Sequence, residues 1–473
     1  MTAQTILPAN SVTGGFEVAN SGRFNIGSSD HLTRSLGGSP TSTRKATWSY
    51  WVKRSTLTSS ASEMIYSNEV ADDNNRGFIQ FEDNDSFRMT DTVSSTQLIT
   101  NRLFRDVSAF YHIVLAIDTT QGTAANRIKL YVNGVQETSF ATASYPDQND
   151  DLKILTGGQT NKQHISKVHG GSGYFGGYLS EFVFIDGLQL AADQFGEFDE
   201  DSGIWKPINV SGLTFGNEGF YLNFQTAAEL GDDVSGNTND FSESNLTALD
   251  QSTDTCTNNF ATMLPLTKST DATLSEGNLN VTYGTASTRR AIFGSIVVTA
   301  GKWFCETKII ATSQTSVEMN LGISNTYDPE AIGNALISTN GFTVSLFPSN
   351  GSLYIGSTRD EQGLGNLAVN DIIGMAINID DGTLQFYKNG SALGSANDIT
   401  TGDSDDGELY PGFTIANSCS SGGQTFTASH NFGSPAYSES GGNSDASGFG
   451  NFSMSVPSGF FSICTKNLAE YGG

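Results

Sequence analysis

Two short stretches, KLYVNGVQ at 129–136 and LQFYKNGS at 384–391, constrain the fold of this chain more than any other feature. In each, apolar and polar residues alternate along a run of β-branched and aromatic residues that leads into Asn-Gly. Such alternation is typical of a half-buried strand, and Asn-Gly favours a type I′ turn because both residues tolerate positive φ. Each stretch therefore predicts a β-hairpin, at Asn133-Gly134 and at Asn389-Gly390.

Strand-like runs separated by turn residues recur along the chain, at 45–54, 77–83, 110–119, 127–134, 174–187, 220–224, 301–310, 316–324, 342–347, 351–357, 371–380, 382–390, 408–415 and 425–433. Only residues 189–198 have a helical pattern, of one or two turns. Short strands at this spacing are typical of two sheets that share one core. The predicted fold is all-β, with two antiparallel jelly-roll β-sandwiches in tandem.

Changes in composition along the chain divide it into five predicted segments. They are an N-terminal attachment segment and first strand (1–40), a first sandwich (41–198), a loop-rich connector that donates one strand (199–265), a second sandwich (266–437) and a C-terminal segment closing that sandwich (438–473).

The overall charge limits the kinds of partner. The net charge of −26 would repel a phosphate backbone, so we expect no nucleic-acid partner. The longest apolar run, 372–379, is too short to span a bilayer, so we expect no membrane insertion.

The N-terminus and the cysteines point to folding in a cytoplasm. MTAQTILPANSV has no basic stretch followed by an apolar one, so we expect no secretory signal. The cysteines lie far apart and form no CxxC pair, and we expect reduced, mostly buried thiols: Cys256, Cys305, Cys419 and Cys464.

The motifs of the first sandwich occur in the order of a known family. TWSYWVKR, HIVLAID, KLYVNG and GYLSEFVFIDGLQLAADQF, within about residues 15–198, resemble a concanavalin A-like lectin domain of the laminin-G-like kind. The resemblance implies a sandwich that binds ligands through its loops.

The second sandwich resembles a SPRY domain over about 170 residues. The motifs are Gly301-Lys-Trp-Phe with Glu306, Asp371-Ile-Ile-Gly, Asp380 to Asn389-Gly390, Leu409-Tyr-Pro and Asn431-Phe-Gly. Cys305 stands where an aromatic residue is more usual. SPRY domains share the sandwich architecture of concanavalin-like lectins and mostly bind protein.

Four further phrases resemble stretches in virion proteins of tailed bacteriophages: DGLQLAADQFGEFDEDSGIWKP, LGDDVSGNTNDF, TNNFATMLPL and VPSGFFSICTKNL. That resemblance implies a place on the outside of a virus particle, with other virion proteins as partners and assembly as a homo-oligomer.

The sequence offers no convincing catalytic pair. Glycanases of concanavalin-like fold need two carboxylates across a sugar cleft. The nearest pattern here, Glu197-Phe-Asp199-Glu200-Asp201, has its third carboxylate at the wrong offset and follows the closing segment of the sandwich. We therefore predict no catalytic residue and no enzyme.

The histidines and the acidic loops are the candidate metal ligands of this sequence. His164 and His169 share a predicted loop without a further ligand at zinc spacing, and His430 is expected to pack on a strand. We predict no metal-binding residue and no cofactor. The loops 71–77 and Asp403–Gly407 offer oxygen ligands, so a structural calcium stays an alternative to plain turns.

No ligand-binding residue can be fixed from the sequence, but candidate loops can be named. Sugar sites combine aromatic platforms with Asp and Asn on loops. Loops 67–76 and 157–175, with Tyr66 and Tyr174 nearby, have that chemistry, and loops 325–341 and 357–366 are the counterparts in the second sandwich.

Three functional hypotheses follow. The first is a non-enzymatic virion protein, a tail fibre, adhesin or exterior decoration, that binds a host-surface glycan or receptor. The second is a capsid or tail component that binds only other virion proteins. The third is a depolymerase of host polysaccharide.

Overall fold

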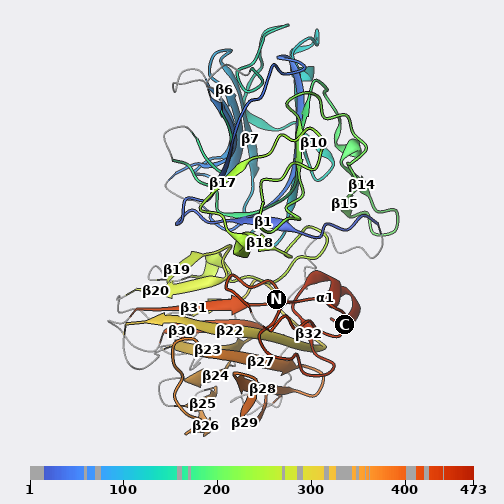
Figure 1. Cartoon of the computed structure of the whole chain (residues 1–473). Coiled ribbons are helices and arrows are strands. Elements are labelled where there is room, and N and C mark those ends of the chain that lie inside the picture. Colours follow the sequence, from blue (N-terminus) through green and yellow to red (C-terminus); the bar gives the residue numbers. More distant parts are fainter. Residues whose placement is uncertain are drawn as a thin grey trace. The chain divides into compact units, whose positions relative to one another are not determined.

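The computed structural model describes residues 15–57, 61–69, 76–156, 162–168, 172–268, 272–284, 291–313, 319–325, 343–347, 351–356, 358–361, 363–400, 412–419, 425–439 and 441–472. These residues form two compact units that divide between Asn258 and Asn259. Each unit contains two antiparallel sheets (Figure 1), which confirms the predicted pair of β-sandwiches.

The N-terminal unit has two sheets of eight strands among its described residues. The first sheet runs in the order β10 (Val135–Glu137), β9 (Ile128–Val132), β8 (Tyr111–Asp118), β3 (Lys45–Arg54), β13 (Gly177–Asp186), β1 (Ser21–Phe24) and β18 (Gln251–Ser252), with β16 (Phe220–Leu222) also paired to β13. The second sheet runs β11 (Phe140–Ser144), β7 (Thr96–Leu103), β6 (Ser86–Asp91), β5 (Arg76–Phe81), β4 (Glu63–Glu69), β12 (Lys162–Ile165), β2 (His31–Ser35) and β17 (Ser242–Ser244).

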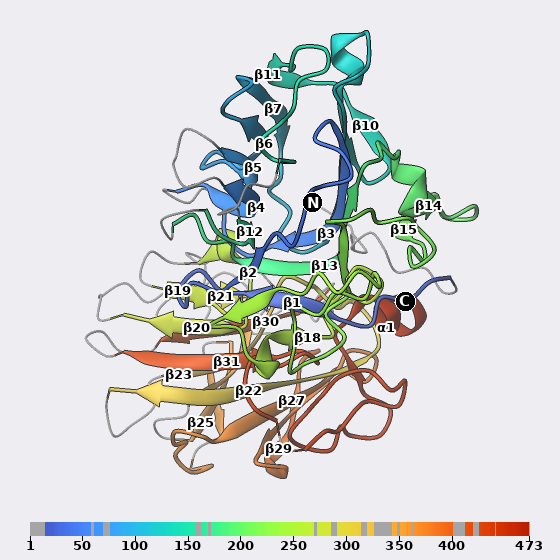
Figure 2. The ribbon, with the colours of Figure 1, turned by 45° about the horizontal axis from the view of Figure 1, so that its top comes forward.

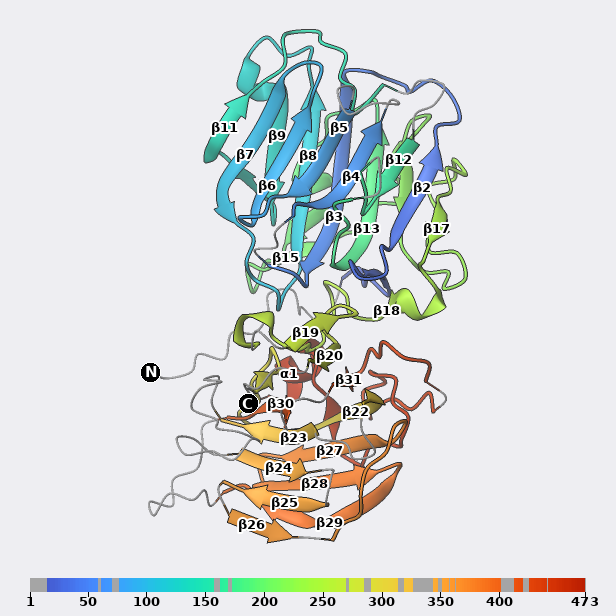
Figure 3. The same ribbon diagram turned by 90° about the vertical axis from the view of Figure 1, so that its left-hand side faces the viewer.

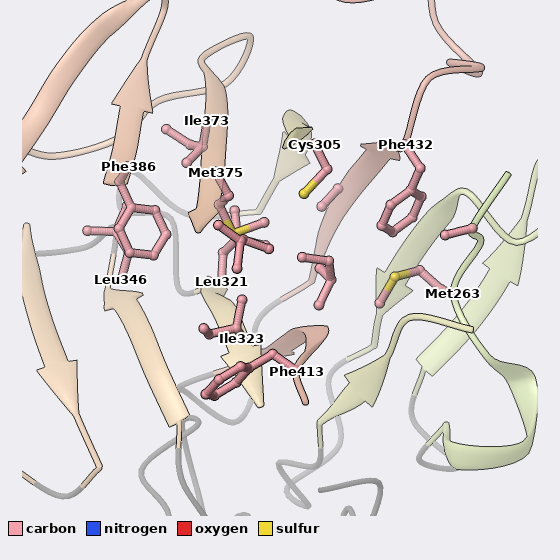
Figure 4. Packing of buried hydrophobic residues seen from close by; sticks show 14 of the residues in the cluster. Met263, Cys305, Leu321, Ile323, Leu346, Ile373, Met375, Phe386, Phe413 and Phe432 are labelled. Atoms are coloured by element: carbon pink, nitrogen blue, oxygen red, sulfur yellow. The ribbon is translucent and has the colours of Figure 1, made fainter. Parts of the chain in front are cut away.

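The C-terminal unit is built in the same way. One sheet runs β19 (Ala272–Ser275), β20 (Asn280–Tyr283), β31 (Phe426–Asn431), β22 (Lys302–Thr312), β27 (Ile372–Asn378), β28 (Thr383–Lys388) and β29 (Ser391–Asp398), with β32 (Phe461–Ser462) parallel to β22. The other runs β21 (Ile292–Phe293), β30 (Thr414–Cys419), β23 (Met319–Ser324), β24 (Thr343–Phe347), β25 (Ser352–Ile355) and β26 (Thr358–Glu361). Figure 4 shows side chains of both sheets meeting in one core.

Both Asn-Gly turns have the predicted backbone. Asn133 and Gly134 have φ of 48° and 79°, and Asn389 and Gly390 have φ of 50° and 85°. Each Asn also makes a hydrogen bond that the sequence did not reveal. The backbone N–H of His112 donates to Asn133 Oδ1 at 2.7 Å, and that of Ile372 donates to Asn389 Oδ1 at 2.8 Å. The turn side chain therefore anchors the start of the neighbouring strand in both units.

The segment 199–265, predicted as a loop-rich connector that donates one strand, is mostly part of the N-terminal unit. Residues 199–258 belong to the N-terminal unit and supply four strands, β15 (Trp205–Pro207), β16, β17 and β18, rather than one. With β14 (Gly196–Phe198), β15 forms a ribbon on the outer side of the first sheet (Figure 2). Of the four strands, β16 lies in the predicted strand-like run 220–224, whereas β15, β17 and β18 are only two or three residues long and show no recognisable strand pattern.

The ribbon covers an apolar outer face of the first sheet. Trp205 lies against the turn at Gly134, where an added Cβ would stand 2.3 Å from the indole. Its Nε1 donates to His112 Nδ1 at 3.0 Å, and His112 in turn stacks on Trp51 with ring centroids 4.6 Å apart. Burial lowers the pKa of His112 to about 3, so the ring is a neutral part of the packing.

A carboxyl group is buried under the same cover. Glu181 lies in a β-bulge of β13 at φ of 49°, between the part of β13 that pairs with β1 and the part that pairs with β16. It is 7% exposed and accepts a hydrogen bond from the Tyr221 hydroxyl. Burial raises the pKa of Glu181 to about 7.

A C-terminal strap covers an outer face of the C-terminal unit. Phe452 and Met454 pack on Phe304 and Ala376, outside the main core. The Glu306 carboxylate accepts the backbone N–H groups of Ser453 at 3.0 Å and of Met454 at 2.9 Å. The chain then ends in β32 and α1 (Thr465–Tyr471), so residues 441–472 pack as part of this unit.

The predicted burial of the cysteines is confirmed for three residues: Cys256, Cys305 and Cys464. The side chain of Cys419 lies outside the described residues.

Substitution of the turn asparagine tests the anchoring hydrogen bond. Asn133→Gly keeps positive φ accessible but removes the acceptor, so we expect it to lower the free energy of unfolding by about 1 kcal/mol. Asn133→Asp keeps an oxygen in place and should cost less. Urea unfolding of the full chain measures both, and equal losses for the two variants would contradict the account.

Replacement of the buried carboxyl tests the effect of pH. The folded-state pKa of Glu181 is raised, so its stabilising contribution is complete below about pH 4.5 and is lost as pH rises through about 7. Glu181→Gln should therefore be more stable than the native chain at pH 8, by up to about 3 kcal/mol, and no more stable at pH 4.5. Melting temperatures at the two pH values decide this, with the exposed Glu200→Gln as control. An identical gain at both values would be inconsistent with a buried ionisable group.

Candidate functional site

The second sheet of the N-terminal unit, whose strands β7, β6, β5, β4, β12 and β2 are seen side by side in Figure 3, carries a row of mostly polar side chains on its outer face. Alternate residues of this sheet, among them Leu32, Ile79 and Met89, point into the core. The residues between them form a row across paired strands: Thr33, His164, Ser67, Phe78, Thr90 and Gln97. A sheet face of this composition offers hydrogen-bonding groups on a rigid support.

The segment that follows β12 folds back over part of this face. The Ser67 hydroxyl donates to the Lys167 carbonyl at 2.8 Å, and the Met64 N–H donates to the Gly173 carbonyl at 2.6 Å. Val168 packs between these bonds on Met64 and Phe78. This fold-back places Lys167 and Tyr174 beside His31, at the start of β2.

His31, Lys167 and Tyr174 meet there. Lys167 Nζ lies 3.5 Å from His31 Nε2, and His31 Nδ1 lies 2.9 Å from the Ser29 carbonyl. Because a carbonyl only accepts, Nδ1 carries the proton of the neutral ring and Nε2 accepts from the ammonium. The rings of His31 and Tyr174 are 5.8 Å apart and tilted by 46°. We call His31, Lys162, His164, Lys167 and Tyr174 the β2–β12 patch.

His164 lies at the base of the patch, on the neighbouring strand. Its Nδ1 is 2.8 Å from Thr33 Oγ1, and the residue is 4% exposed. The pKa of His164 is lowered to about 4, first by burial and then by the positive charges of Lys167, His31 and Lys162. At neutral pH the ring is therefore uncharged among cationic neighbours.

A second polar group occupies the middle of the same face. Arg88 Nη1 lies 2.9 Å from Glu82 Oε1, which also accepts from Gln80 Nε2 at 2.8 Å. The guanidinium carbons of Arg76 and Arg88 lie 5.3 and 5.4 Å from the centre of the Phe78 ring. These cation–π contacts hold two arginines across the sheet surface.

The structure separates the two tyrosines that were named as candidate sugar platforms. The expectation for Tyr66 is wrong, since its ring is fully buried in the core against Trp48 at 5.4 Å. It comes from a bulged strand, in which the register shifts between Met64 and Tyr66, so simple alternation misplaces it. Tyr174 is half-buried in the patch and stays a candidate.

Much of the four candidate loops lies outside the described residues: 70–75, 157–161, 169–171, 326–342, 357 and 362. The same holds for the candidate calcium loop Asp403–Gly407 and for most of 71–77. Within the described ranges, the structure contains no group of three or more His, Cys, Asp or Glu side chains arranged to hold a metal ion.

The acidic segment at 197–201 forms an ordered turn. Asp199 Oδ1 accepts the backbone N–H groups of Asp201 at 3.2 Å and Ser202 at 2.9 Å. Lys206 Nζ lies 3.2 Å from Asp199 and 3.4 Å from Glu197. The hydrogen bonds from Ser202, with help from Lys206, lower the pKa of Asp199 to about 2. An always-ionised turn residue has the wrong chemistry for a general acid.

Of the three histidines discussed above, the structure confirms the expectation for His430 and corrects that for His164. His164 lies on β12 and not in a loop, and His169 lies outside the described residues. His430 is packed on β31 as predicted, with Thr307 Oγ1 3.0 Å from its Nδ1. Burial lowers its pKa to about 3.

Sequence reasoning missed His31, Thr33 and Lys167. The first two lie on β2, within the stretch predicted as an attachment segment with one strand. The alternation in His-Leu-Thr-Arg-Ser was the available signal, but the strand is short and its apolar set is one leucine. Lys167 reaches the patch through the fold-back after β12, which no sequence pattern encodes.

Comparisons with known proteins identify both domains. Residues 11–192 match the family model of the concanavalin A-like lectin/glucanases superfamily. Residues 305–427 match the SPRY domain model. The chain thus contains a concanavalin A-like domain followed by a SPRY domain. No described helix has both the length and the apolar character needed to cross a bilayer.

Solved structures show distant likeness. The SPRY domain of human HERC1 is 15% identical, with a TM-score of 0.28, covering 36% of this chain and 96% of that one. A Bacteroides ovatus protein named for a provisional carbohydrate-binding role is 13% identical, with a TM-score of 0.32, over 48% and 58% of the two chains. A heptameric pentraxin from Limulus polyphemus is 15% identical, with a TM-score of 0.27, over 38% and 82%. At these scores the likenesses carry no argument about ligands. No curated protein matches the chain.

The ionisation of His164 tests the electrostatics of the patch. We expect its pKa near 4, and we expect Lys167→Met to raise that pKa because a nearby positive charge is removed. Nuclear magnetic resonance titration of the full chain measures both, and Lys129→Met, on the first sheet, is the matched control. A midpoint above pH 6, or no response to Lys167→Met, would refute the arrangement.

Proposed function

We propose that this protein is a non-enzymatic binding protein whose concanavalin A-like domain recognises a host-surface glycan or receptor through the outer face of its second sheet. The observation that carries the proposal is the β2–β12 patch. It combines an aromatic ring, Tyr174, with the ammonium of Lys167, both from the segment after β12, beside His31 of β2. Sugar sites need this combination of a platform and oriented polar groups.

The covering of two other outer faces supports the choice of this one. The ribbon β14–β15 covers the first sheet of the N-terminal unit, and the strap around Phe452 covers one sheet of the C-terminal unit. Those faces are apolar and act as secondary cores. Ser67, His164 and Thr90 of the face that bears the patch are buried, but His31, Lys162, Lys167 and Tyr174 are partly or fully exposed, so these side chains can contact water and a polar ligand.

We further propose that the protein acts on the exterior of a bacteriophage particle, as a fibre, adhesin or decoration, and is made in the host cytoplasm. The resemblance of four sequence phrases to virion proteins supports this location. The acidic charge supports it too, since like-charged copies resist aggregation when crowded. Homo-oligomeric assembly would let weak sugar contacts add through avidity.

A second candidate is a capsid or tail component that binds only other virion proteins. The match of residues 305–427 to a SPRY domain favours it, because such domains mostly bind protein. The depolymerase hypothesis has less support, since Asp199 and Glu197 share the ammonium of Lys206 in an exposed turn.

A glycan array probed with the full chain tests the proposed function. We expect binding to a subset of bacterial surface glycans, and we expect Tyr174→Ala to weaken it roughly three- to tenfold through the lost aromatic contact. Tyr354→Ala, on the C-terminal unit, should leave affinity unchanged. Binding to no glycan and to no host cell would overturn the proposal and favour the protein-only candidate.

Immunogold labelling tests the location. Gold at the tail tip, the collar or the head of purified particles would assign the protein to a fibre or a decoration. Particles that contain none of the protein would contradict a virion role.

A further inference from the structure

The β2–β12 patch differs in charge from the chain that carries it. The protein has 24 Lys and Arg against 50 Asp and Glu, so a surface site chosen at random would be acidic. The patch instead gathers two lysines and two histidines on adjoining strands and the fold-back after β12. A positively charged patch on a strongly acidic protein favours the binding of negatively charged ligands at that patch.

The cationic groups act on one another at short range. Lys167 Nζ is within 3.5 Å of His31 Nε2, and Lys162 precedes His164 by two positions on β12, on the same face of the strand. Bringing like charges together costs free energy, because each lysine lowers the proton affinity of the neighbouring rings. A bound anion would relieve that repulsion.

The acidic residue next to His31 in the sequence points away from the patch. Asp30, beside His31, is 2% exposed and turns inward to accept the backbone N–H of Asn25 at 2.9 Å. The positive charge at this end of the patch is that of Lys167, which lies beside the neutral His31 ring and near Tyr174.

From this juxtaposition we infer that the site takes an acidic sugar, with its ring on Tyr174 and its carboxylate or sulfate group at the Lys167 ammonium, beside the neutral ring of His31. The inference rests on the proposed glycan-binding function and narrows its ligand to an anionic class.

Two matched ligand pairs test the inference by calorimetric titration of the full chain at low salt. One pair is an oligogalacturonate and its fully methyl-esterified form, and the other is a sulfated galactan oligosaccharide and its desulfated form. Within each pair only the anionic group changes. We expect the charged member of at least one pair to bind roughly fivefold tighter or more, and the preference to fall as salt is added.

Three variants identify the groups responsible. Lys167→Met should bring the charged and uncharged members to similar affinity while leaving the uncharged member unaffected. Tyr174→Ala should weaken both members, because it removes the shared platform. Lys129→Met, which removes a lysine from the first sheet, should change neither.

The outcomes separate this inference from the proposed function. A preference for the charged member that survives Lys167→Met would overturn the inference, as would binding of only neutral glycans on the array, and glycan recognition would stand in both cases. Binding of no member of either pair, together with an empty array, would overturn both. A preference limited to one pair would identify the anion as a carboxylate or as a sulfate.

Discussion

The structure depends on the need to cover apolar sheet faces. A β-sandwich has four faces, and the two inner ones bury each other. In this chain the first sheet of the N-terminal unit is apolar outside as well, with Trp51 and Val114 among its outward residues. Exposing such a face to water would cost roughly 25 cal/mol for each Å². Part of the stretch 199–258 therefore packs on this face, with Trp205, Val210 and Phe215 in the outer apolar cluster, while β16, β17 and β18 extend the two sheets.

The two domains share more than architecture. In both, an asparagine at positive φ closes the hairpin and accepts a hydrogen bond from the strand beside it. Asn133 of the lectin-like domain and Asn389 of the SPRY-like domain therefore occupy equivalent positions and make equivalent hydrogen bonds, each within its own domain. Both hairpins are scaffold, and in the N-terminal unit the polar residues suited to recognition lie on the opposite sheet.

The sequence predicts what local patterns determine. The strand 45–54 agrees with β3 to the residue, because aromatic residues alternate along it on both faces. The predicted closing segment 189–198 contains one short 3₁₀ turn, Ala192–Gln194, before β14. The Asn-Gly turns are also correct, since their chemistry is contained in two residues.

Features that depend on long-range packing could not be predicted in this way. The strand β2 was not recognised, although it supplies His31 to the patch. Tyr66 lies on a bulged strand whose register no local pattern reveals, and two strands of 199–258, β17 and β18, pair with β2 and β1 from much earlier in the chain. The patch itself depends on the fold-back after β12, which brings Lys167 to a histidine 136 residues earlier in the chain.

Hydrogen exchange of the full chain with and without a bound acidic oligosaccharide tests the central claim most directly. If the outer face of the second sheet is the recognition surface, peptides that cover 31–35 and 162–168 will exchange more slowly in the complex, while those of β9 and of the C-terminal unit will be unchanged. Protection that falls instead on the C-terminal unit, or on the covered first sheet, would contradict the account.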